Sequence, residues 1–450
     1  MNTLLLARLQ FAFTIGFHYI FPPLSIGLGL LLVIMEGAYL KTGKAVYYQM
    51  TRFWVRVFGL IFAIGVATGI VMEFEFGTNW ATYSRFVGDV FGSALAAEGL
   101  FAFFLESVFL ALLLFGWDKI SRKMHFFSTV MVALGAHFSA IWIIVANSWQ
   151  QTPTGHQIVA HGLKTRAEIT DFWAMVFNPS TVDRLSHTIM GAWQAGAFLV
   201  ISVSAYYLLK KKHIDFARTS IKIALAVAVL ASLGQLLTGH SSAVMIAEHQ
   251  PAKLAAFEGH FPASAPADMY LLGWVNDEQE QVFGIRLPGI LSLILYGDTN
   301  TPVTGLRSFA PEDRPPVNIV FQAYHLMVMI GMTLIGLSLL SAWLFQRRRL
   351  LKNILMLKIL MVAVLLPQIA NQLGWIAAEV GRQPWIVYGL LRTSDALSKS
   401  VGAGAILSSL ILFTLIYLLL FALFVFLLDH KIKVGPAAED LITATHMADS

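Results

Sequence analysis

The sequence contains no cysteine and little charge. None of its 450 residues is Cys, which excludes disulfides, iron–sulfur clusters, thiolate zinc sites and covalent c-type haem. Charged residues make up 13% of the chain and hydrophobic residues 57%. A soluble globular chain carries about a quarter charged residues, so this chain could not cover a soluble surface. We therefore expect it to lie in lipid, where the net charge of +5 reflects basic loops and not nucleic-acid binding.

Nine segments are long and apolar enough to span a membrane, because a spanning helix needs about 20 mostly apolar residues. The first has no basic leader and exceeds the apolar core of a signal peptide, so we expect it to be retained. The pattern predicts an all-α integral membrane protein. The expected spans are residues 11–39, 53–75, 91–116, 126–148, 185–209, 219–240, 319–345, 354–376 and 402–428.

Basic residues alternate between the connections and predict the orientation of the chain. The odd-numbered connections and the segment after the last span are rich in Lys and Arg, whereas the even ones are poorer for their length. By the positive-inside rule, the odd connections and the C-terminus lie in the cytoplasm and the N-terminus lies outside. The basic clusters include Lys41, Lys44, Arg52, Arg56, Lys119, Arg122, Lys123, Lys210, Lys211, Lys212, Arg218, Arg347, Arg348, Arg349, Lys352, Lys431 and Lys433.

One connection is much longer than the others. Residues 241–318 lie outside by the charge argument and are rich in Pro, Gly and charge, and loops beyond about 15 residues are usually functional or disordered. The apolar piece 287–296 indicates that this loop is partly folded against the membrane. The chain thus divides into spans one to six (1–240), this extracytoplasmic loop (241–318), spans seven to nine (319–430) and a cytoplasmic tail (431–450).

Ionisable residues inside the spans indicate function, because burying them in lipid costs several kcal/mol. His18 in the first span is either bonded to a neighbouring backbone or an axial haem ligand. Glu98 and Glu106 lie in the third span, about 12 Å apart along the helix and about 80° around it. Each could simply hydrogen-bond a neighbouring helix. Two carboxylates in one span also suit a proton route that waters would complete.

A second group of polar residues lies toward the outer face. His187 and Met327 are suitable axial ligands for a six-coordinate haem, and His325 is a rival ligand that spacing does not exclude. Glu379 follows the eighth span, and Arg382 could pair with it or with a haem propionate. We expect His125, His137 and His240 to be structural. Asp118 and His125 flank the cytoplasmic side of the third connection, and each is either part of a solvated loop or an entry point for protons.

Several strings of residues resemble subunit I of cytochrome bd-type quinol oxidases. The resemblance runs from residue 4 to about residue 429, and the nine spans and outward N-terminus agree with that family. The strings are Leu6-Ala7-Arg8-Leu9-Gln10-Phe11 with Phe17-His18, Met72-Glu73-Phe74-Glu75-Phe76-Gly77-Thr78-Asn79-Trp80, the Glu98/Glu106 span, Asn147-Ser148-Trp149-Gln150-Gln151-Thr152-Pro153, Gly374-Trp375 and Gly381-Arg382-Gln383-Pro384-Trp385.

The resemblance implies roles for the matching residues. It implies that His187 and Met327 ligate the low-spin haem b that takes electrons from quinol. It implies that His18 and Glu379 serve two high-spin haems. Which of the two residues serves haem d is left open. Glu98 would lie close to the oxygen-binding haem, and Glu106 beside the pair.

The string from Gln250 to His260 resembles the family's quinol loop, with Lys253 and Glu258 at its quinol-site positions. Lys253 could hydrogen-bond a quinone oxygen and Glu258 could accept a quinol proton. The loop resembles the short, cyanide-insensitive version, in which a further haem b can replace haem d. A second departure is His325, since the family usually has Arg two residues before the ligating Met.

The resemblance implies a respiratory quinol:oxygen oxidoreductase of the bacterial inner membrane. Ubiquinol or menaquinol would be oxidised outside, and oxygen reduced to water with protons from the cytoplasm. A second membrane subunit, and a small single-span subunit, would be partners. Two alternatives are a proton-coupled transporter without a redox cofactor and a haem-binding quinol:acceptor module that does not touch oxygen.

Overall fold

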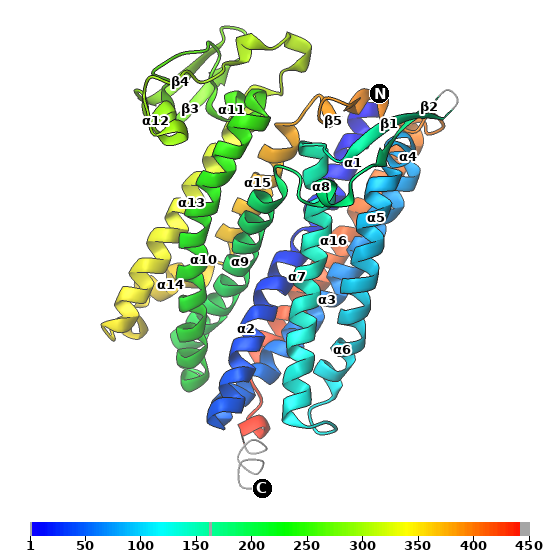
Figure 1. Ribbon diagram of the computed structural model, residues 1–450. Coiled ribbons are helices and arrows are strands. Elements are labelled where there is room, and N and C mark those ends of the chain that lie inside the picture. The colour runs from blue at the N-terminus through cyan, green and yellow to red at the C-terminus, as the bar shows by residue number, and fades with distance from the viewer. Residues whose placement is uncertain (1, 162–163, 442–450) are drawn as a thin grey trace.

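The predicted all-α membrane architecture is confirmed. A computed structural model describes residues 2–161 and 164–441, and in this part of the chain nine helical segments are long and apolar enough to cross a membrane. Six of them are single helices, and they run roughly parallel through the molecule (Figure 1). The six are α3 (Ala45–Thr78), α7 (Arg122–Gln151), α9 (Thr181–Leu209), α10 (Ile214–His249), α13 (Val317–Gln346) and α16 (Ala403–Val434).

The other three spans are interrupted helices. The first joins α1 (Thr3–His18) to α2 (Phe21–Thr42), whose first turn contains Pro22 and Pro23, residues that suit that position. The eighth joins α14 (Ile354–Val362) to α15 (Leu365–Val380), where Pro367 cannot donate a hydrogen bond to the preceding turn. The third joins α5 (Gly88–Glu98) and α6 (Phe104–Phe115) through a π-helical turn, η1 (Gly99–Phe103).

The connections contain short helices and three antiparallel hairpins, which the apolar pattern did not predict. Their strands pair only with each other in the described residues, as β1–β2, β3–β4 and β5–β6. The elements are α4 (Ala81–Phe86), β1 (His156–His161), β2 (Lys164–Ile169), α8 (Phe172–Val176), α11 (Pro251–Glu258), β3 (Met269–Asn276), β4 (Gln281–Leu287), α12 (Ile290–Tyr296), η2 (Leu306–Ser308), η3 (Pro311–Asp313), η4 (Leu350–Lys352), β5 (Trp385–Val387), β6 (Leu391–Arg392) and η5 (Thr393–Asp395).

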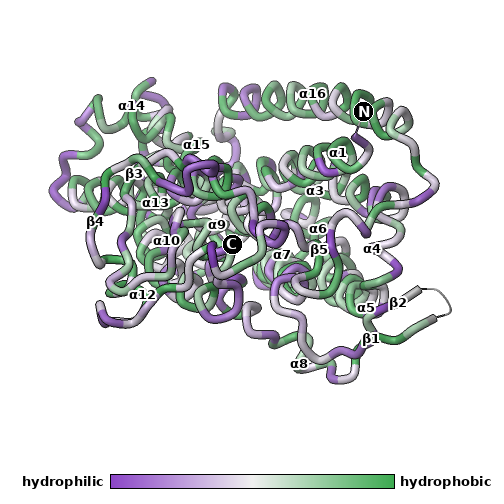
Figure 2. Tube along the Cα trace, turned by 90° about the horizontal axis from the view of Figure 1, so that it is seen from above, coloured by the Kyte–Doolittle hydropathy of each residue, from purple (hydrophilic) through white to green (hydrophobic). Residues whose placement is uncertain are grey.

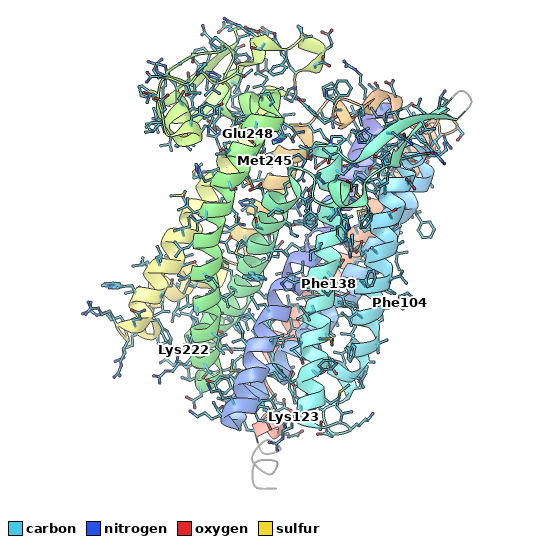
Figure 3. All side chains as sticks on the ribbon, in the orientation of Figure 1. Phe104, Lys123, Phe138, Lys222, Met245 and Glu248 are labelled. Atoms are coloured by element: carbon cyan, nitrogen blue, oxygen red, sulfur yellow. The ribbon has the colours of Figure 1, made fainter. Side chains whose placement is uncertain are left out.

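The two ends of the bundle differ. The N-terminal helix, the hairpins and the long connection with α11 and α12 gather at one end, and the chain leaves α16 at the other (Figure 1). Lys123 and Lys222 lie toward the α16 exit, whereas Glu248 lies just below α11 (Figure 3). Seen along the bundle, α16 lies at the edge beside α1, and α8, β1 and β2 lie at the opposite edge (Figure 2). We call the two ends the loop end and the tail end.

The long connection is folded, as expected from its apolar piece. Helix α10 continues to His249, so the connection proper begins with α11. The apolar residues after Leu287 form α12, whose Leu291 and Leu295 pack with Leu254 of α11. Past α16, the tail folds back on α3, where Gln49 Nε2 donates to the Ala437 carbonyl oxygen at 2.8 Å. Residues 442–450 of the expected tail lie outside the described part.

Two glycines set the crossing of α2 and α9 at the centre of the bundle. A Cβ built on Gly196 would lie 2.4 Å from the Gly27 carbonyl carbon, and one on Gly27 would lie 2.2 Å from the Ala192 carbonyl oxygen. The obstructing atoms are backbone, so neither helix can make room by changing a rotamer. Small residues permit such close helix contacts in membranes.

We therefore expect Gly196→Val to reduce the yield of folded protein strongly, since a clash with backbone costs on the order of 1–3 kcal/mol or more. Gly336→Val is the matched control, because no atom of the described residues lies within 4 Å of a Cβ at that mid-helix position. The measurement is the amount of monodisperse protein extracted from membranes. Equal yields from both variants would show that this contact does not hold the bundle together.

Candidate functional site

The two predicted histidine ligands share one hydrogen-bond arrangement. His18 Nδ1 lies 3.0 Å from Thr68 Oγ1, and His187 Nδ1 lies 3.0 Å from Thr238 Oγ1. Each threonine donates its own proton to a carbonyl oxygen one turn earlier on its helix, so it can only accept from the histidine. The proton of the neutral ring is therefore on Nδ1, and the lone pair of Nε2 is available for a metal. Fixing the tautomer by a second hydrogen bond is usual for histidine ligands.

Small residues face these side chains and leave room beside them. Cβ atoms added to Gly69 and Gly239 would contact His18 and His187 at 3.3 and 3.4 Å, respectively. A Cβ on Gly374 would lie 3.0 Å from the sulfur of Met327. His187 thus lies against α10, and Met327 against α15.

The rival ligand His325 has a backbone carbonyl oxygen within hydrogen-bond distance of each ring nitrogen. Its Nδ1 lies 2.9 Å from the Phe321 carbonyl oxygen and its Nε2 lies 2.8 Å from the Tyr270 carbonyl oxygen. The ring also stacks on Phe321, with the centroids 3.8 Å apart. This geometry leaves neither nitrogen free, which favours Met327 over His325 as the ligand.

Glu379 was expected after the eighth span, but it lies in the last turn of α15, because that helix continues to Val380. Its carboxylate accepts hydrogen bonds from Gln151 Nε2 at 3.0 Å and Asn147 Nδ2 at 3.3 Å. Arg382 donates to the other oxygen, and Arg184 lies 3.8 Å away. Arg382, whose partner the sequence left open, is therefore paired with Glu379 and also with Gln150 Oε1 at 3.0 Å.

Three residues that lie beside the Glu379 carboxylate were not singled out from the sequence. Asn147 and Gln151 lie in a string that carried the resemblance, but Arg184 had no such mark. Arg184 also donates to Asn147 and lies over Trp375, 5.7 Å from the ring centroid. An arginine three residues before His187, at the start of an apolar segment, was the available signal.

The π-helical turn changes the relation of Glu98 and Glu106. An unbroken α-helix would separate them by about 80° around the axis. In the structure both face α7: Glu98 accepts from Ser139 Oγ at 2.5 Å, and a Cβ on Gly135 would lie 2.3 Å from Glu106 Cγ. The wider turn between them rotates the two carboxylates onto one neighbouring helix. π-Helical insertions are frequent at functional sites.

Lys253 and Glu258 lie on α11 but do not point into one common space. Five residues separate them, which places them roughly 140° apart around the helix. Lys253 Nζ donates to Gln151 Oε1 and Gln250 Oε1, and Glu258 has Tyr324 of α13 as its hydrogen-bond partner. Both side chains are 3% exposed. Gln151 therefore joins Lys253 directly to the Glu379 cluster.

Burial shifts the ionisation of both residues. Burial, with repulsion from Arg184 and Arg382, holds the pKa of Lys253 well below its usual range, against the attraction of Glu379. Burial raises the pKa of Glu258 to about 7, although the bond from Tyr324 opposes the shift. In the described chain, Glu258 Oε2 is buried without a hydrogen-bond partner. At neutral pH this carboxylate can gain or lose a proton.

The other histidines differ in their surroundings. His137 is bonded on both nitrogens, to the Ala133 carbonyl oxygen at 2.7 Å and to Trp193 Nε1 at 2.9 Å, which suits the structural role expected of it. His240 lines an opening at the loop end with Asp183 and Glu248. His125 is only 3% exposed and lies within α7, so the expectation that it belongs to a solvated loop is wrong.

The side chains fit haem iron better than a protein-only metal site. Within the described ranges, no three His, Asp or Glu side chains converge closely enough to hold a metal ion. Haem needs only one or two axial ligands from the protein, because the porphyrin nitrogens supply the rest. Single neutral histidines with a free Nε2, beside glycines, meet that need. A helical bundle of this kind belongs to the class of multi-span membrane redox proteins.

Comparison with known proteins identifies the family. The family described as "Cytochrome bd terminal oxidase subunit I" matches residues 6–436. The chain is 41% identical over 446 residues to "Cytochrome bd ubiquinol oxidase subunit 1" of Bacillus subtilis (strain 168), covering 97% of this chain and 94% of the relative. It is 35% identical over 500 residues to "Cytochrome bd-II ubiquinol oxidase subunit 1" of Escherichia coli (strain K12), covering 96% and 97%.

A solved structure of the bd oxidase from Geobacillus thermodenitrificans matches with a TM-score of 0.90 and 28% identity, covering 97% of this chain and 99% of that one. The chain therefore belongs to the cytochrome bd terminal oxidase subunit I family. Membership confirms the predicted resemblance and the enzyme class, a respiratory quinol oxidase with haem cofactors in the bacterial inner membrane. The alternative of a transporter without a redox cofactor is not supported.

Proposed function

We propose that this chain oxidises quinol at the loop end and reduces oxygen to water with protons drawn from the tail end. The observation that carries the proposal is the chain of contacts from Lys253 through Gln151 to Glu379, which joins the quinol-loop helix to a predicted haem ligand. Two quinols deliver four electrons to one oxygen molecule and release four protons. Four protons taken from the opposite side complete two water molecules, so charge separates without a pump.

At the loop end, Lys253 and Glu258 are the proposed quinol-site residues. An amine with a lowered pKa can hydrogen-bond a quinol oxygen without a fixed positive charge. A carboxylate with a pKa about 7 can take the quinol proton and release it to the outside. The substrate is ubiquinol or menaquinol; another relative, 32% identical, is described as "Putative cytochrome bd menaquinol oxidase subunit I" of Bacillus subtilis (strain 168).

The proposed haem ligands are His187 and Met327 for a low-spin haem b, with His18 and Glu379 for two high-spin haems. One of these is haem d, or a further haem b in its place. When bound, haem supplies one-electron transfer and the centre for oxygen reduction. The protein orients His18 and His187 through Thr68 and Thr238, as their tautomers require. Arg184 and Arg382 lie beside the carboxylate of Glu379 and offset its negative charge.

The carboxylates of the third span are the proposed proton carriers. Glu106, on α6, lies toward the tail end, and Glu98 precedes it on α5. Both contact α7, so a proton can move along one helix interface toward the loop end. About 12 Å of helix separates the two residues, and waters complete the route.

The proposed orientation places the N-terminus and the loop end outside and the tail end in the cytoplasm. Lys123 and Lys222 lie toward the tail end (Figure 3), as the positive-inside rule requires. The proposed division keeps residues 1–240 and 319–430 as membrane regions, 241–318 as the quinol-binding loop and 431–450 as the tail.

The proposed partners are a second membrane subunit and a small single-span subunit, and not nucleic acid. The surfaces available to them are apolar helix faces that the described chain leaves exposed. On α6 these include Phe104, which lies near Phe138 of α7 (Figure 3), and on α16 they include Leu419 and Phe426.

Oxygen consumption tests the proposed function. Purified protein supplied with a short-chain quinol should consume oxygen at a steady rate. Reduction of the haems by quinol without oxygen consumption would instead identify a haem-binding quinol:acceptor module. That outcome would overturn the proposal.

The pKa of Glu258 predicts how this rate depends on pH. A proton acceptor must be ionised, so the rate should rise about tenfold per pH unit below pH about 7 and level off above about 8. The measurement is quinol-driven oxygen uptake at saturating quinol in a series of buffers. A rate that falls between about pH 6 and 8 would contradict Glu258 as the acceptor.

A further inference from the structure

A buried acid–base pair near the tail end has no role in the route described so far. Glu36 of α2 and His125 of α7 are 2% and 3% exposed, and His125 Nδ1 lies 2.6 Å from Glu36 Oε1. The other carboxylate oxygen accepts from Thr129 Oγ1, which is 1% exposed. Desolvating a carboxylate is costly, so a group placed here is either structural or carries a proton.

The hydrogen bonds leave one proton free to move. His125 Nε2 lies 3.2 Å from the carbonyl oxygen of Leu113, which can only accept, so Nε2 carries a proton. Thr129 donates to Glu36 Oε2. The 2.6 Å bond between Nδ1 and Oε1 then contains one further proton. Transfer of that proton between the two atoms would break the N–H bond as the O–H bond forms, or the reverse.

Aromatic and charged groups cover the pair on its solvent side. The ring of Trp117 lies against that of His125, with the centroids 3.9 Å apart. The Arg52 guanidinium lies 5.5 Å from the centroid of Trp117, and its Nε lies 3.3 Å from a carboxylate oxygen of Asp440 in the tail. A cluster from α3, the third connection and the tail thus separates the pair from solvent.

His125 of the pair lies on α7, the helix that both proposed proton carriers contact. His125 and Thr129 precede Gly135 on α7. Gly135 is the residue of α7 that lies against Glu106. The six residues from Thr129 to Gly135 correspond to about 9 Å of helix. Leu113, which holds Nε2 of His125, lies two turns beyond Glu106 on α6. His125 therefore bridges the α2–α7 and α6–α7 interfaces on the tail side of Glu106.

We propose that Glu36, His125 and Thr129 form the first internal proton-holding site between the cytoplasm and Glu106. This inference rests on the proposed function, because it needs a reaction that consumes protons from the tail end. The site accepts one proton from the cytoplasm past Trp117 and passes one proton toward Glu106. The next proton from the cytoplasm then restores the protonated pair.

Glu36→Gln tests the proposal, since the amide keeps the size of the side chain but cannot carry a proton. The haem spectrum should be unchanged, while oxygen uptake per haem should fall at least about tenfold and show a larger solvent deuterium isotope effect. Glu36→Asp should restore part of the rate. Glu75→Gln is the matched control: Glu75 is also 2% exposed and also bonded to a threonine, Thr14, but lies toward the loop end.

A purely structural pair gives a different result: lower haem content and protein yield, with uptake per haem within about twofold of the unaltered protein. That result overturns the proposal. If Glu36→Gln does not assemble, Thr129→Val is the second test, because it replaces only the hydroxyl. We expect this variant to slow oxygen uptake and raise the isotope effect. An unchanged rate and isotope effect would overturn the proposal. Failure of the proposed function is distinct, since the unaltered protein would then consume no oxygen with quinol.

Discussion

Replacing His187 with alanine should remove the low-spin haem signal and reduce quinol-driven oxygen uptake at least about 100-fold. The expected cause is the loss of an imidazole whose Nδ1 proton is held by Thr238, which leaves its Nε2 available for a metal. Thr238→Val should have a smaller effect, because losing such a supporting bond typically costs about 10–100-fold in metal affinity or activity. The reduced-minus-oxidised spectrum and oxygen uptake measure both effects.

His325→Gln is the control for His187→Ala. Each ring nitrogen of His325 faces a backbone carbonyl oxygen, so this variant should keep the low-spin haem. Retention of that haem in His187→Ala and its loss in His325→Gln would reverse the ligand assignment. Loss in both variants, with a shared fall in protein yield, would indicate a general packing defect, which Thr238→Val separates from ligand loss.

Replacing Glu258 with alanine should abolish quinol-driven oxygen uptake while leaving the haem spectrum intact. The carboxylate is the buried group of α11 with a pKa about 7, and general base catalysis commonly contributes about 100- to 10,000-fold. Uptake driven by an artificial electron donor that carries no proton should persist. This difference separates loss of the quinol site from loss of the oxygen site.

Glu280→Ala is the matched control, because Glu280 lies in the same connection but is paired with Arg307 and Arg314. It should leave quinol-driven uptake unchanged. Unchanged uptake in Glu258→Ala would refute the assignment of this carboxylate, and an equal loss in Glu280→Ala would attribute the effect to disruption of the loop.

The membrane spans could be predicted because their signal is local and strong. A run of about 20 apolar residues suits only a buried environment, and all nine runs became helices in the described chain. The hairpins could not be predicted in the same way. The β3–β4 pair is held by backbone hydrogen bonds between segments whose side chains, such as Trp274 and Phe283, remain exposed.

The candidate site was predictable only as far as single residues carry the signal. A histidine or glutamate in an apolar run is visible from the sequence, and so His18, His187, Glu98 and Glu106 were found. Their partners come from distant segments: Thr238 is 51 residues from His187, and Ser139 is 41 residues from Glu98. Threonine and serine are common in helices, so nothing local marks them.

Glu98 and Glu106 could share a face by spacing and both contact α7, but a regular helix does not describe how they do so, and the expectation of a solvated loop around His125 failed. The relative direction of Glu98 and Glu106 depends on a π-helical turn with no distinctive residues. His125 follows a basic loop, yet α7 begins at Arg122 and carries it inward to meet Glu36. Glu36 lies near the end of the first apolar run, just before basic residues, and the sequence did not predict a role for it.

The absorbance of the purified protein tests the central claim most directly. A reduced-minus-oxidised spectrum with pyridine haemochrome analysis should show haem b, together with a haem d band or additional haem b. Haem bound to His18 and His187 would use the Nε2 atoms that the Nδ1–threonine hydrogen bonds leave available. A folded, monodisperse protein without haem absorbance would contradict the account.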